Sequence, residues 1–122
     1  MTSTKPTVWK NQTRLELGFQ GLPQDQKLYY RILHDNNPNS IIGGPKTGQI
    51  TNEICYFILA TDRLKSYKQL TVKIYRKRSW SKDEQLDESS FHVEALFTEK
   101  HNWISLDIQP DSKMYLFVDQ SH

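Results

Sequence analysis

The chain has 122 residues, of which 36% are hydrophobic and 25% charged, and its sixteen basic side chains exceed its fourteen acidic ones by two. This length fits one domain with a single core. The composition excludes a disordered chain and an integral membrane protein. Because a net charge of +2 is small, any attraction to nucleic acid or anionic lipid has to come from local clusters of basic residues.

Cysteine content and the N-terminus indicate the class of protein. Cys55 is the only cysteine in the sequence, so a domain stapled by intramolecular disulfides is excluded. A lone thiol favours a reducing compartment, and we expect a cytoplasmic protein, with export after removal of a signal peptide as the alternative. Residues 1–12 hold no apolar segment of signal-peptide length. We expect them to form a flexible arm ahead of one domain over residues 13–122.

Apolar and polar residues alternate with a period of two along most of the chain, which is the pattern of half-buried strands. The alternation places Leu15, Leu17 and Phe19 on one face of the first such segment. Residues 54–61 are apolar on both faces, which predicts a central, buried strand. The seven expected strands cover residues 13–22, 27–34, 54–61, 69–78, 91–97, 102–108 and 113–119.

The connections decide the architecture. Residues 62–68 predict one helical turn or a long connection, residues 79–90 a short helix or a solvated loop, and residues 40–44 an optional eighth strand at an edge. Parallel βαβ units lack their crossover helices here, because no helical period of ten or more residues separates the strands. The sequence therefore predicts an all-β, antiparallel two-sheet sandwich of about seven strands, immunoglobulin-like or of a related Greek-key type, with a small β-barrel as the alternative.

The stretch SIIGGPKTGQITNE, residues 40–53, has the composition of a phosphate-binding loop. Gly43 and Gly48 have the required spacing, but a phosphate loop needs Lys and then Ser or Thr directly after the second glycine. Gln49 and Ile50 stand there, and the residues that follow predict a strand rather than a helix. Nucleotide binding is therefore not expected, and residues 35–52 are interpreted as a long connection that acts as a lid or a contact loop.

Catalytic and metal-binding patterns are weak. Cys55 lies in the most apolar run, where a small buried hydrophobe is the expected role. The four histidines have no short metal-ligand spacing, and the acidic residues 83–88 are interpreted as a solvated loop. We expect no enzyme, no metal and no cofactor. A hydrolytic or carbohydrate-active site that combines His34, His92 and a few carboxylates is the weakest alternative.

Residues 63–82 contain eight basic side chains in twenty residues, with Tyr67, Tyr75 and Trp80 among them. Cations set among aromatic rings can hold a phosphate backbone and stack on bases. Strand alternation divides the basic residues between two faces, which weakens the argument. Nucleic-acid binding is therefore the alternative function, with these candidate residues: Lys73, Tyr75, Arg76, Lys77, Arg78 and Trp80.

Several apolar residues fall on faces that the alternation assigns to solvent. They are Leu96, Trp103, Tyr115 and Phe117. If their strands are neighbours, these side chains form one exposed patch, and such patches usually mark a partner site. The competing interpretation is that a loop, such as residues 36–52, covers them. The leading hypothesis is a non-enzymatic module that binds another protein or a second copy of itself, as an accessory component or adaptor of a larger assembly.

Overall fold

The computed structural model describes residues 11–38, 50, 54–98 and 103–119. Within them, seven strands form two antiparallel sheets: sheet A in the order β3-β1-β7-β6, and sheet B in the order β2-β4-β5. The strands are β1 Gln12–Gln20, β2 Leu28–His34, β3 Ile54–Ala60, β4 Gln69–Arg76, β5 Glu84–His92, β6 Ile104–Ser105 and β7 Lys113–Asp119. The predicted two-sheet sandwich is confirmed.

The core lies between the two sheets, as the period-two alternation predicts. Leu15 and Leu17 of β1 are fully buried, and so are Val72 and Ile74 of β4 on the facing sheet. Full burial of such a side chain contributes about 1.5–3 kcal/mol. These alternating apolar residues hold the sheets together, and they leave the other residues of each strand on an outer face.

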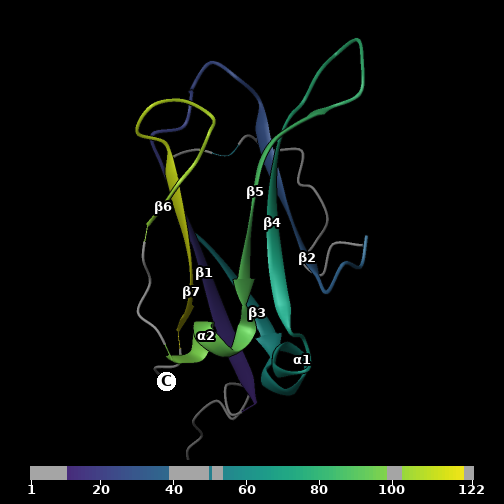
Figure 1. The fold of residues 1–122 in the computed structure, drawn as a ribbon, viewed down its shortest axis with the longest axis vertical. Helices are drawn as coiled ribbons and strands as arrows, with labels where there is room; N and C mark the ends of the chain where they lie inside the picture. The colour runs from purple at the N-terminus through teal and green to yellow at the C-terminus, as the bar shows by residue number, and fades with distance from the viewer. Residues whose placement is uncertain (1–10, 39–49, 51–53, 99–102, 120–122) are drawn as a thin grey trace, which may run out of the picture.

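Two short helices lie at one end of the sandwich, and the hairpin between β4 and β5 projects at the opposite end (Figure 1). The first helix, α1 Thr61–Lys65, is the single helical turn expected after β3, and it buries Leu64 completely. The second, α2 Val93–Thr98, follows β5. In the part of the chain that the structure describes, neither helix has the length and apolar composition needed to cross a bilayer.

The prediction of a central strand over residues 54–61 is wrong. β3 lies at the edge of sheet A and pairs with β1. Its outward residues are Ile54, Tyr56 and Ile58, whose exposed fractions are 49%, 51% and 47%. A strand that is apolar on both faces can be buried in the middle of a sheet or lie at its edge with an apolar outer face, and composition does not distinguish the two.

The segment from residue 79 to residue 98 also differs from the prediction. The expected loop over residues 79–90 contains most of β5, a polar strand that pairs with β4. The expected strand over residues 91–97 is helical from Val93 onward. Val93 and Leu96 are buried and Phe97 packs against the core, and this spacing of three and then one residues is that of a helix face. Tertiary packing therefore selected the helical period over the alternating one.

Residues 102–108 form less strand than predicted. β6 covers only Ile104–Ser105. The chain then turns back, with the hydroxyl of Ser112 donating to the carbonyl of Gln109 (2.7 Å) and Asp111 in the left-handed region at φ 67°.

The long connection after β2 is described at its two ends. Asp35 and Asn36 have positive φ, and the Asp35 carboxylate accepts hydrogen bonds from the backbone N–H groups of Lys68 and Gln69 (3.0 Å each). At the other end the buried Ile50 donates its N–H to the carbonyl of Leu28 in β2 (2.8 Å). The glycine-rich stretch, the optional strand over residues 40–44 and most of the N-terminal arm lie outside the described residues.

Candidate functional site

The outer face of sheet A gathers apolar side chains from three segments of the chain. Glu16 and Gly18 of β1 lie on this face, because Leu17 between them points into the core. The strand register sets Tyr56 of β3 and Phe117 of β7 on either side of Glu16. We call the aromatic face the set formed by Ile54, Tyr56, Ile58, Trp103, Tyr115 and Phe117.

One half of the aromatic face is built on Gly18. The ring of Tyr115 lies directly over this glycine, so closely that a Cβ there would be 2.6 Å from Cζ of the ring. The Tyr115 hydroxyl donates to the carboxylate of Glu16 (2.5 Å). Trp103 meets the Tyr115 ring edge to face, with 4.7 Å between ring centroids. Burial, and then the bond to Glu16, raise the pKa of Tyr115 above its usual value, so the hydroxyl stays a donor.

The charged residue at the other end of the face is paired. Arg14 forms an ion pair with Asp119 of β7, and its guanidinium lies 4.6 Å from the ring centroid of Tyr56. The hydrogen bond to Asp119, as the largest cause, raises the pKa of Arg14. The register places Arg14 between Ile58 and Asp119. The aromatic face is thus bordered by a compensated charge rather than by a lone one.

Three of the four residues predicted to bind a partner lie on the aromatic face, and one does not. Trp103 is 44% exposed, Phe117 is half-buried, and Tyr115 is almost covered at 4%. Leu96 belongs to α2 and packs in the core, so its predicted outward position is wrong. Sequence reasoning missed the β3 residues, although their signal, an apolar run on both strand faces, was visible.

The residues predicted to bind nucleic acid are divided among three places. Lys73 and Tyr75 lie on the outer face of sheet B, where Tyr75 stacks on Tyr29 with centroids 5.1 Å apart. Arg76 and Arg78 form ion pairs with Glu84 across the β4–β5 hairpin. The other two, Lys77 and Trp80, are exposed, and Trp80 at the hairpin end is 98% exposed.

The base of this hairpin is fixed by a side-chain clamp. The Tyr29 hydroxyl donates to one carboxylate oxygen of Asp83 (2.5 Å), and the backbone N–H of Arg78 donates to the other (3.1 Å). These bonds lower the pKa of Asp83, while burial and the bond to Asp83 raise the pKa of Tyr29 to about 12. The clamp holds the exposed end of the hairpin in one position relative to sheet B.

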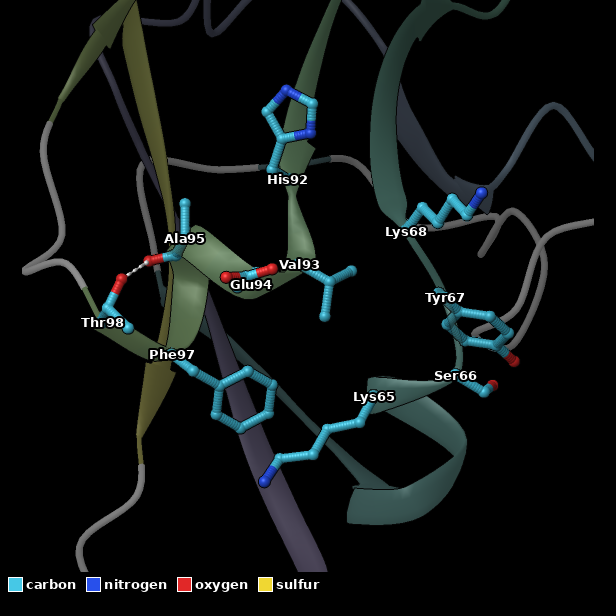
Figure 2. A pocket seen from close by; sticks show the side chains of 10 residues that line it. All are labelled: Lys65, Ser66, Tyr67, Lys68, His92, Val93, Glu94, Ala95, Phe97 and Thr98. Carbon is cyan, nitrogen blue, oxygen red and sulfur yellow. Dashed lines mark hydrogen bonds between the residues drawn. The ribbon is translucent and has the colours of Figure 1, made fainter.

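At the other end of the sandwich, a shallow pocket of about 1170 Å³ lies between α1 and α2. Figure 2 shows Lys65 of α1 reaching toward Phe97 of α2, and the Lys65 ammonium is 5.1 Å from the centroid of that ring. Lys68, His92 and Glu94 also line the pocket. The mixture of two cations, one carboxylate and a histidine is not the oxygen-rich set that a calcium ion requires.

The histidines and acidic residues do not combine into a reactive site. His34 stacks on Tyr67, with 4.0 Å between ring centroids, whereas His92 lines the pocket between the helices. Over the described ranges, no three His, Cys, Asp or Glu side chains are grouped so that they could hold a metal ion. Cys55 is half-buried on β3 and is not disulfide-bonded.

No protein-family model and no curated protein match the chain. Among solved structures, its fold is similar to that of the two C2 domains of extended-synaptotagmin 2, with a TM-score of 0.50 and 16% identity over 98% of this chain and 44% of that one. The fold is C2-like. A C2 domain-containing protein is also similar, with a TM-score of 0.47 and 15% identity over 88% of this chain and 85% of that one. At such identities the C2-like architecture carries no ligand with it.

Proposed function

We propose that this chain is a non-enzymatic, C2-like binding module that binds another protein on its aromatic face. The observation that carries the proposal is the row Ile54, Tyr56 and Ile58, three large apolar side chains that stay about half exposed on neighbouring outward positions of β3. Contiguous exposed apolar surface usually marks an interaction site.

The chemistry of the aromatic face supports a protein as the partner. Tryptophan and tyrosine side chains supply much of the binding energy at protein interfaces, and both are present on this face. Arg14 is paired with Asp119, and Glu16 accepts a hydrogen bond from Tyr115. Docking an apolar partner surface here therefore does not strand an unpaired charge away from water.

A capture experiment with substitutions far from β3 tests the proposal. The tagged domain is incubated with an extract of its source cells, and the captured proteins are quantified by mass spectrometry. Trp103→Ala and Phe117→Ala are expected to lower the capture of the specific partner at least about tenfold, because each removes a large apolar contact. Trp80→Ala removes an exposed indole elsewhere and is the matched control.

The control variant should capture the partner as the wild type does. Equal capture by the wild type, both face variants and the control would remove the aromatic face from consideration as the binding site.

The end of the β4–β5 hairpin supports a second candidate function, docking on an anionic membrane surface. Trp80 is 98% exposed, and Lys77 and Lys82 beside it are exposed too. Asp83 is held by Tyr29, and Glu84 by two arginines. The acids next to the lysines are therefore compensated within the domain. An indole set among cations suits the interface of an anionic bilayer.

The membrane candidate has a direct test, and C2 domains typically bind lipids. The probes are vesicles of phosphatidylserine and phosphatidylcholine, with phosphatidylcholine alone for comparison. Trp80→Ala, and Lys77→Ala with Lys82→Ala, are expected to lower binding to the anionic vesicles by about fivefold or more per lysine removed. Trp103→Ala serves as the control here. Binding to single-stranded DNA or RNA at low salt, without vesicle binding, would favour the nucleic-acid alternative instead.

A further inference from the structure

β3 is a terminal strand of sheet A, and within the described residues it pairs with β1 alone. The pairing uses the whole strand, from Ile54 opposite Gly18 to Ala60 opposite Gln12. In an antiparallel strand the backbone N–H and C=O groups point alternately to its two sides. β3 therefore carries a second row of these groups directed away from β1.

β3 lacks the devices by which natural edge strands avoid pairing with other chains, which are charges, prolines, bulges and short length. Its seven residues, ICYFILA, include no charged side chain, no proline and no glycine. The other described edges differ. β6 has two residues, β5 carries three acidic side chains, and β2 receives the N–H of Ile50 at Leu28. β3 is thus the long, apolar edge among the described strands.

We infer that β3 pairs antiparallel with β3 of a second copy of the chain, across a two-fold axis at Phe57. The inference rests on the proposed function in taking this sheet as a protein-binding element, and it names the partner. An axis at Phe57 uses all seven residues of each strand. It sets Tyr56 opposite Ile58 of the second copy, twice, on the outer face.

The pairing is self-complementary in its side chains, which is the argument for a second copy. An aromatic residue opposite a β-branched one is a favourable cross-strand pair, whereas like charges placed opposite one another are destabilising. No charged side chain of β3 enters the interface, and Arg14, in the neighbouring strand, is already paired with Asp119. The two four-stranded sheets become one, and the two aromatic faces become continuous.

Sedimentation velocity over a dilution series tests the inference. The wild-type mass is expected to rise with concentration from 14.4 kDa toward twice that value. Tyr56→Lys and Ile58→Glu are each expected to weaken association at least about tenfold, because each sets a charge opposite an apolar side chain. An equimolar mixture of the two variants should recover association, since the introduced ammonium and carboxylate lie opposite each other in the mixed dimer.

Gln85→Lys, at an exposed position on the edge strand of sheet B, is the matched control and should dimerise as the wild type does. A wild type that stays monomeric up to its solubility limit overturns the inference, and so does association that Tyr56→Lys and Ile58→Glu leave unchanged. Association of the wild type without recovery in the mixture assigns the contact to another surface or register and overturns it too. A monomeric wild type whose partner capture still depends on Trp103 and Phe117 would leave the proposed function standing.

Discussion

Gly18 determines how the aromatic ring of Tyr115 sits on sheet A. The ring occupies the space in which any other residue would place its Cβ. This close approach also brings the Tyr115 hydroxyl to Glu16 (2.5 Å) and leaves the ring edge available to Trp103. One glycine in the middle of a strand thus sets the shape of half the aromatic face, although glycine weakens strands in general.

Gly18→Ala is expected to destabilise the domain by about 1–3 kcal/mol, because the added Cβ displaces the Tyr115 ring and breaks its bond to Glu16. Denaturant unfolding followed by circular dichroism measures the change. In a Tyr115→Ala background the same substitution should cost clearly less, since nothing then overlies the new methyl group. A full cost in that background would show that the ring is not the reason for the glycine.

Asp35 illustrates a different use of one side chain, in a turn. Burial tends to raise the pKa of its carboxyl, but the hydrogen bonds from the backbone of Gln69 and Lys68 outweigh burial, and the pKa is lowered from 3.8. A carboxyl of this kind stabilises the folded chain above its unfolded pKa, and the contribution is lost as the pH falls through the folded value. The bonds join the end of β2 to the start of β4.

At the scale of elements, the β4–β5 hairpin depends on strand β2 for its position. Tyr29 lies in β2, and its hydroxyl reaches Asp83 near the start of β5. Like the turn at Asp35, this contact joins segments that are distant in sequence. It explains how a hairpin with an exposed tryptophan at its end can be held in place without covering that tryptophan.

The clamp predicts an alkaline transition. The pKa of Tyr29 is raised from 10.0 to about 12, so its contribution to stability is present below pH 10 and is lost as the pH rises through about 12. Asp83→Asn is expected to lower the Tyr29 pKa part of the way back, because burial, the larger cause, remains. The ultraviolet absorption of tyrosinate, titrated in both proteins with Tyr29→Phe as the reference, measures this. Identical titrations of the wild type and Asp83→Asn would contradict the clamp.

At the scale of the whole molecule, the sandwich separates what holds the domain together from what it presents to partners. The inward residues of β1, β4 and β7 are nearly all fully buried, whereas the outward residues of β3 are about half exposed. The two sets are distinct because a strand sends alternate side chains to opposite faces. Substitutions on the aromatic face can therefore change association without unfolding the domain.

Ile54→Thr combined with Ile58→Thr is expected to change the free energy of unfolding by no more than about 1 kcal/mol, as is usual for exposed positions. The same variant should reduce self-association and aggregation, which light scattering measures. Leu15→Ala, at a fully buried position, is expected to cost about 2–5 kcal/mol and serves as the comparison. A loss of stability in the double variant as large as that of Leu15→Ala would mean that β3 is part of the core on both faces.

The sequence by itself determined where most strands lie and which of their residues point inward. The predicted strand over residues 113–119 has the bounds of β7, and the inward residues of β1 and β4 agree with the prediction. It succeeds there because alternation is a local property of the chain. It also identified Trp103, Tyr115 and Phe117 as outward residues of one sheet.

Only the tertiary structure decided which strands are neighbours and what each outer face meets. Strand order put the apolar β3 at an edge, where the sequence pattern equally allows a central place. Packing turned residues 93–98 into a helix and moved Leu96 from the predicted surface into the core. These outcomes depend on contacts between residues far apart in the chain, which no short sequence pattern specifies. The same contacts bring β3 and β7 to the two sides of β1 and so create the aromatic face.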